Sequence, residues 1–165
     1  DSRDSIVSPD KGVYAKLEPM FYDEAFGGDF NYTKTELSAV SYWPISNVVL
    51  GLRVHGKFTS GDVPFYDAPF IDIRGIPALR YQGETAAAFE LEGRYHLGER
   101  WSVSLFAGAG SVSVGDDITE SSDNIRTVGL GTRFLALRKQ DAWIGLDVAQ
   151  GPEDLAWYIQ IGSPW

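Results

Sequence analysis

An arginine and a glycine stand at the centre of the longest irregular stretch of the chain. The middle of residues 60–84, a segment rich in proline and aromatic residues, reads Ile73, Arg74, Gly75, Ile76. Loops of this length are uncommon inside a domain and are usually functional or disordered. A guanidinium can bind a carboxylate through two parallel hydrogen bonds, and glycine lets the backbone turn sharply. Alone, the Arg-Gly pair would fit a surface turn. Because alternating strands flank the loop, we instead predict that the arginine tethers it to a carboxylate.

Titratable residues follow this loop at alternating positions. Glu90, Glu92, Arg94 and His96 share one face if the segment is a strand. Such a set could serve acid–base catalysis, and His96 with His55 could bind a metal ion beside the glutamates. No nucleophile stands next to a base in a recognisable context, however. We therefore expect no enzyme activity, no metal and no cofactor, and we expect the histidines to serve as hydrogen-bonding groups.

The composition limits the classes of protein. A chain of 165 residues fits a single domain over residues 1–165, and the absence of cysteine excludes disulfides and thiolate metal sites. The 23 acidic residues outnumber the 14 basic ones, which argues against a nucleic-acid partner. No run approaches the ~20 apolar residues of a membrane helix, and no signal peptide is recognisable. The acidic run from Asp116 to Asp123 lacks the ligand spacing of a calcium loop and predicts a solvated loop.

Alternating polar and apolar residues predict eight β-strands. They run near residues 13–22, 31–43, 48–58, 87–96, 101–110, 127–136, 142–148 and 155–165. The connections near residues 45, 98 and 139 are short, whereas those near residues 26, 72 and 117 are longer. Alternation of short turns with long loops is typical of outer-membrane barrels. A soluble barrel would instead turn its apolar face inward around a ligand.

The two faces of these strands favour the membrane. The polar face carries charges of both signs, which fit a polar lumen, although a solvated outer face could also hold them: Lys16, Glu18, Lys34, Glu36, Arg53, His55, Lys57, Glu90, Glu92, Arg94, His96, Arg133 and Asp147. Aromatic residues gather near strand ends, where interfacial girdles lie: Tyr22, Tyr42, Trp43, Tyr95, Trp101, Trp157 and Trp165. The pattern predicts an all-β fold, an eight-stranded antiparallel up-and-down transmembrane β-barrel.

Several motifs extend this interpretation to a family. The turn formed by Asp1–Asp4 and Pro9–Gly12, the loop segments Gly61–Tyr66 and Ile73–Gly75, and the ending Tyr158–Trp165 carry the resemblance. Together they resemble the carboxy-terminal half of a bacterial surface antigen barrel. That superfamily includes the barrel subunit of the outer-membrane assembly machinery and the two-partner-secretion transporters. The resemblance implies a location in the bacterial outer membrane with both termini periplasmic.

The resemblance also implies roles for particular residues. The arginine of the loop motif folds into the lumen, where the family commonly holds it with an aspartate on the second strand after the loop. The corresponding run here, residues 106–110, has no carboxylate. The candidate partners of Arg74 are therefore Glu90, Glu92 and Asp147, because an unpaired buried guanidinium is too costly to keep.

The ending of the chain corresponds to another family feature. Its Tyr158, Gly162 and Trp165 resemble the terminal strand signal by which such barrels are recognised for insertion.

The implied function is a part in outer-membrane protein insertion or translocation, with outer-membrane lipid and the barrel-assembly machinery as partners. The family barrel has sixteen strands, so three arrangements are open: a closed narrow barrel, two chains paired as a homodimer, or half of a wider barrel. Because an eight-stranded barrel is filled by its own side chains, we expect closure with the long loop outside. A soluble ligand-binding barrel and a lipid-modifying barrel enzyme remain alternatives.

Overall fold

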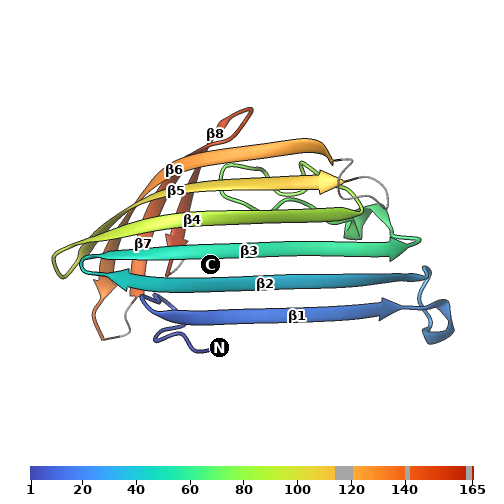
Figure 1. Ribbon diagram of the computed structural model, residues 1–165, viewed down its shortest axis with the longest axis horizontal. Coiled ribbons are helices and arrows are strands. Elements are labelled where there is room, and N and C mark those ends of the chain that lie inside the picture. The colour runs from blue at the N-terminus through green and yellow to red at the C-terminus, as the bar shows by residue number, and fades with distance from the viewer. Residues whose placement is uncertain (114–120, 140–141, 163–164) are drawn as a thin grey trace.

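The chain folds into one antiparallel sheet in which each strand pairs with the next along the sequence (Figure 1). The computed structural model describes residues 1–113, 121–139, 142–162 and 165. Its elements are β1 (Gly12–Tyr22), η1 (Glu24–Phe26), β2 (Tyr32–Ile45), β3 (Val48–Gly61), η2 (Phe65–Asp67), β4 (Thr85–Leu97), β5 (Trp101–Ser113), β6 (Ser121–Leu137), β7 (Ala142–Gln150) and β8 (Leu155–Ile161). Among the described residues, no helix is long and apolar enough to cross a membrane. The predicted all-β, up-and-down arrangement of eight strands is confirmed.

The β5–β6 hairpin is longer than the alternation indicates. Residues 111–124 were expected to form a loop, but β5 extends to Ser113 and β6 begins at Ser121, with Ser111 opposite Asn124. This expectation is wrong because strand pairing satisfies backbone N–H and C=O groups even where the side chains are polar. The expected acidic loop lies partly outside the described residues, which end at residue 113 and resume at residue 121.

The sheet buries its polar face and exposes its apolar face. On β4, Glu90 and Glu92 are 0% and 2% exposed, whereas Phe89 and Leu91 are 51% and 50% exposed. The same inversion appears on β5, where Ser104 is buried and its apolar neighbours are exposed. Soluble proteins show the opposite pattern, with charged side chains outside. A polar interior and an apolar outer face are the signature of a membrane-spanning sheet and do not fit a soluble ligand-binding barrel.

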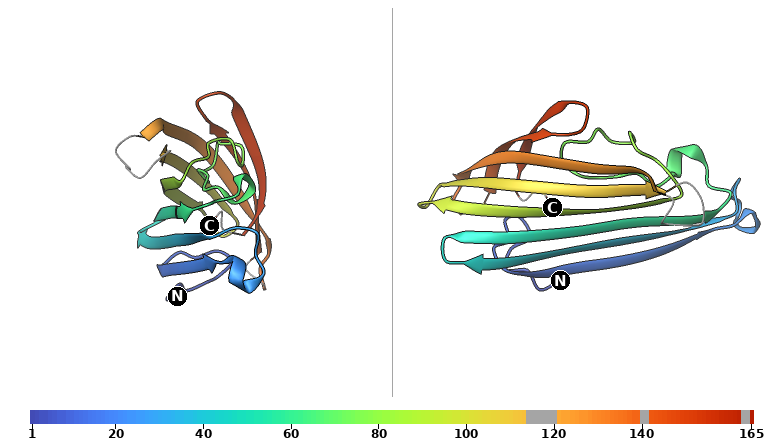
Figure 2. Two further views of the ribbon diagram at one scale, coloured as in Figure 1. Left: turned by 90° about the vertical axis from the view of Figure 1, so that its right-hand side faces the viewer. Right: turned by 45° about the horizontal axis from the view of Figure 1, so that its top comes forward.

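The sheet curves into a gutter with the long loop on its concave side (Figure 2). Within the described residues, β1 pairs only with β2 and β8 pairs only with β7, so closure into a barrel is not seen. The concave side of an open sheet is wider than the lumen of a closed barrel made of the same strands. The expectation that the loop lies outside is therefore wrong, because the concavity of the open sheet accommodates it.

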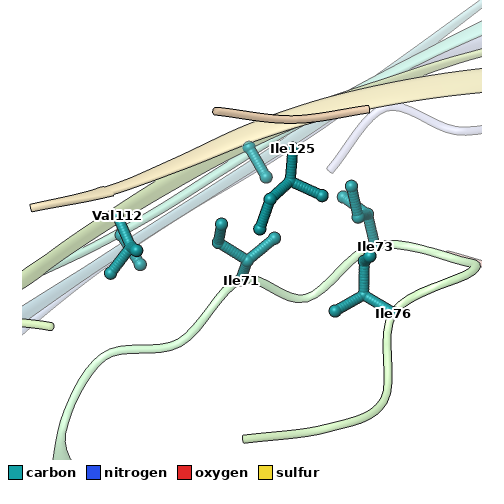
Figure 3. Packing of buried hydrophobic residues seen from close by; sticks show 7 residues of the cluster. Ile71, Ile73, Ile76, Val112 and Ile125 are labelled. Carbon is teal, nitrogen blue, oxygen red and sulfur yellow. The ribbon is translucent and has the colours of Figure 1, made fainter. Parts of the chain in front are cut away.

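Apolar side chains of the loop form a small core against the sheet. Ile71, Ile73 and Ile76 are 1%, 4% and 7% exposed and pack with residues of β4, β5 and β6, among them Val112 and Ile125 (Figure 3). Burying an isoleucine side chain contributes on the order of 1.5–3 kcal/mol relative to leaving it in water. The loop is thus held in the concavity by burial as well as by charge.

The amino-terminal residues cross the concave side at the short-turn end. The guanidinium of Arg94, on the polar face of β4, donates to the carbonyl of Pro9 at 2.7 Å. A Cβ added to Gly162, just beyond β8, would lie 2.8 Å from the Val7 carbonyl oxygen. Residues 1–11 therefore link elements from both halves of the sheet at this end.

Candidate functional site

Arg74 lies at the tip of the loop and contacts carboxylates from two separated strands. Its Nε donates to Glu90 Oε1 at 2.9 Å, and its Nη1 donates to Glu92 Oε2 at 2.7 Å and to Asp147 Oδ2 at 3.0 Å. Arg74 is 7% exposed. The structure thus brings all three candidate partners, from β4 and β7, onto the arginine of the loop motif.

Two further arginines extend this arrangement into a network. Arg133 on β6 donates to both oxygens of Asp147, at 2.7 and 3.1 Å. Arg53 on β3 donates to Glu90 at 3.2 Å and to Asp72 of the loop at 2.7 Å. A buried charge costs several kcal/mol unless it is paired and hydrogen-bonded, so the network keeps its members in place. We call it the arginine network; its members are Arg53, Arg74, Arg133, Asp72, Glu90, Glu92 and Asp147.

An aromatic ring covers the face of the Arg74 guanidinium. The carbon at the centre of the guanidinium lies 3.6 Å from the centroid of Phe106, close enough for a cation–π contact. Phe106 stands in the run where the family resemblance implied an aspartate. A Cβ on Gly129 would lie 2.3 Å from the Phe106 ring, so glycine leaves the space that the ring occupies. Sequence reasoning missed Phe106; its one signal was an aromatic residue on the otherwise polar and small-residue face of β5.

Gly75 lets the tip of the loop pack closely against β6, β7 and β8. Its φ of +97° is a conformation that side chains disfavour, and an added Cβ would lie 3.2 Å from Thr127 and 3.3 Å from Ala149. The Gly75 N–H donates to the Tyr158 hydroxyl at 2.9 Å. A Cβ on Gly151 would lie 2.2 Å from the Gly75 carbonyl oxygen. The contact of Tyr158 with the loop was not foreseen, because the residue was considered only as part of the terminal strand.

The end of the described chain turns inward instead of continuing the strand. Strand β8 ends at Ile161, and Gly162 adopts a φ of +84°. Trp165 packs 6.1 Å from Tyr42, which is 2% exposed, and a Cβ on Gly51 would lie 2.8 Å from the Trp165 ring. The expectations that the last strand extends to Trp165 and that Tyr42 joins an interfacial girdle are therefore wrong. The small surface of Gly51 leaves a site on the concave face for the indole.

Both ends of the loop are anchored as well as its centre. The Asp67 carboxylate accepts hydrogen bonds from Tyr32 at 2.8 Å and from Lys34. Burial alone would raise the pKa of Asp67, but the hydrogen bonds from Lys34 and Tyr32 outweigh it and hold the pKa below its usual value. At the other end of the loop, Arg80 Nε and Nη2 donate hydrogen bonds to the two carboxylate oxygens of Glu153, at 3.1 and 2.7 Å.

The two histidines lie apart. His55 faces Ala88 across the β3–β4 ladder, eight positions from His96 along β4, about 26 Å at the usual rise of a strand. His96 instead lies 3.4 Å from Asp10. Burial alone would raise the pKa of Asp10, but the contact with His96 and the charge of Arg94 outweigh burial and hold the pKa below its usual value. Among the described residues, no group of three or more His, Asp or Glu side chains has the arrangement of a metal site.

The geometry of the sheet and loop can now be compared with known families. Residues 1–72 match the family model of the Omp85 superfamily domain. The match covers 72 of the 165 residues and agrees with the superfamily predicted from the sequence. The matched part of the Omp85 domain covers β1, β2 and β3 and the loop as far as Asp72, just before the Arg74 motif. No curated protein matches the chain. The match is consistent with a protein of the bacterial outer membrane, to which an apolar outer face is suited.

Proposed function

We propose that this chain forms the membrane-spanning wall of an Omp85-type protein that inserts or translocates other proteins across the outer membrane. The observation that carries the proposal is the inverted sheet, with lipid-compatible side chains outside and the arginine network inside. A wall of this kind keeps a polar space open within the bilayer. The match to the Omp85 superfamily domain supports it independently.

The free edges of the sheet support action on β-strand substrates. In the described residues, β1 and β8 each pair with one strand, and the other side of each is open to a further strand except where Ser2 hydrogen-bonds to Val13 at the start of β1. Such an edge is a template for an added strand, whose main chain supplies the hydrogen bonds and whose sequence matters little. The edges also suit pairing with further strands of the same barrel or with a second copy as a homodimer.

The arginine network supports a fixed loop rather than a freely moving one. Three guanidinium groups and four carboxylates join the loop to β3, β4, β6 and β7. A loop held at this depth narrows the polar space and keeps the strands at a constant spacing. In this proposal the loop stiffens the sheet, while the edge strands β1 and β8 bind the substrate. The short-turn end, with the amino-terminal residues, faces the periplasm and the barrel-assembly machinery during insertion.

Reconstitution tests this function. The protein in liposomes is mixed with an unfolded outer-membrane β-barrel substrate, and folding of the substrate is followed by its heat-dependent shift in gel mobility. We expect faster folding than in empty liposomes and than in liposomes holding an unrelated eight-stranded barrel. Equal rates in all three preparations would contradict the proposal.

A further inference from the structure

A groove of about 790 Å³ lies on the outer face of the sheet across β3 to β6. Its outward-facing lining includes Leu52, Val54, Ala87, Phe89, Ala109 and Arg126. Ala87 and Ala109 are small, and larger side chains such as Phe89 line the groove with them. It lies toward the ends of the strands that carry the longer connections.

One cation stands at the polar end of this groove. Arg126 is exposed on the outward face of β6, on the same face as Val128 and Leu130, which are 51% and 65% exposed. A charged residue facing lipid destabilises a membrane barrel at depth, and it is tolerated near the interface or beside an opposite charge. Ser111 and Asn124 lie opposite each other on β5 and β6, next to Arg126, and both line the groove.

We propose that this groove binds a phosphorylated glycolipid of the lipid A type, with an acyl chain along the alanines and a phosphate on Arg126. A guanidinium matches the geometry of a phosphate, and the Ser111 hydroxyl and Asn124 amide can hydrogen-bond to sugar hydroxyl groups. An acyl chain suits an apolar groove that opens toward the bilayer. The assignment to a glycolipid rests on the proposed function and orientation, in which the ends with the longer connections face the outer leaflet.

Binding of diphosphoryl lipid A to the detergent-solubilised protein, followed by native mass spectrometry, tests the site. Arg126→Gln should weaken binding about tenfold, the loss expected for a hydrogen bond to a charged group. Ala109→Trp should also weaken it by filling the groove from the outward face. Arg138→Gln is the matched control, since Arg138 is an exposed cation at the opposite end of β6 and should leave binding unchanged. Heat-dependent gel mobility verifies that each variant is folded.

Equal lipid A binding by folded wild-type, Arg126→Gln and Ala109→Trp proteins would overturn the proposal. Phosphatidylglycerol binding as tightly as lipid A, with the same dependence on Arg126, would overturn the assignment to a glycolipid. The test is independent of the folding assay above. Arg126-dependent lipid A binding by a protein that fails to accelerate substrate folding would support this site and contradict the proposed function.

Discussion

Arg74 is the residue on which the interior of the sheet converges. Among the described residues, it is the one group that contacts all three of Glu90, Glu92 and Asp147, and these carboxylates are almost completely buried. Without the guanidinium, Glu92 would lose the partner recorded for it and would stand buried beside two other carboxylates, which would keep only Arg53 and Arg133 as partners.

Replacing Arg74 by alanine should therefore destabilise the protein by about 3–5 kcal/mol, the usual cost of breaking a buried ion pair. The midpoint of unfolding by urea in detergent measures this change. Arg80→Ala is the control, because Arg80 forms an exposed bidentate pair at the end of the same loop and its loss should leave the midpoint almost unchanged. Similar midpoints for the wild type and Arg74→Ala would contradict the account.

Gly129 sets the position of the ring that covers Arg74. Gly129→Ala should cost about 1–3 kcal/mol, as overpacking of a core does, because its Cβ would collide with Phe106. Phe106→Leu in the same chain should restore part of the loss by shortening the side chain. Gly28→Ala, where an added Cβ would lie 3.5 Å or more from its neighbours, should have little effect on the unfolding midpoint. An unaltered midpoint for Gly129→Ala would contradict this packing.

Residue types in the sequence were sufficient to propose the partners of Arg74, since a buried guanidinium requires carboxylates and few of them face inward. They were insufficient for Phe106 and Tyr158. Both contacts depend on the position at which the tip of the loop meets the sheet. The alternation of polar and apolar residues along a strand does not determine that position. Trp165 shows the same limit, because its inward turn depends on the space beside Gly51.

At the scale of elements, the loop is held by charge at its beginning and near its centre. Asp67 binds Lys34 and Tyr32, and Asp72 binds Arg53. Burial alone would raise the pKa of Asp72, but the charge of Arg53 and its hydrogen bond hold the pKa below its usual value. A carboxyl group with a lowered pKa stabilises the folded state above its unfolded pKa. That contribution is lost as the pH falls through the folded value.

The loop should accordingly loosen in acid. Because the chain has no cysteine, Tyr66→Cys gives a unique site for a spin label on η2 beside Asp67. Label mobility should rise as the pH falls from the ordinary aspartate pKa of ~3.9 to about 2, because the pKa of Asp67 in the folded protein lies below the ordinary value. Asp67→Asn should make the label mobile already at neutral pH. A label that stays equally immobile over the whole range in both proteins would contradict the anchoring.

The strands were predictable because a period of two in hydrophobicity follows directly from the pleat. The ends of the strands were less predictable: in the β5–β6 hairpin, strand pairing continues through polar residues. The position of the loop was predicted wrongly, because it depends on the width of the sheet. Local sequence patterns do not determine whether β1 and β8 meet.

In the molecule as a whole, the sheet buries polar side chains on its concave side and exposes apolar side chains on its outer face. Its tryptophans report on both faces. Trp101 and Trp157 are 50% and 68% exposed on the outer face, whereas Trp143 is 8% exposed and faces His96 on the concave side. In a membrane, the first two should touch lipid and the third should not.

Quenching of tryptophan fluorescence by brominated lipids tests this claim most directly. Three variants, each retaining one of these tryptophans with the others replaced by phenylalanine, are reconstituted into bilayers of brominated phospholipid. We expect strong quenching of Trp157 and Trp101 and weak quenching of Trp143. Quenching of Trp143 as strong as that of Trp157, or no quenching of either outward tryptophan, would contradict it.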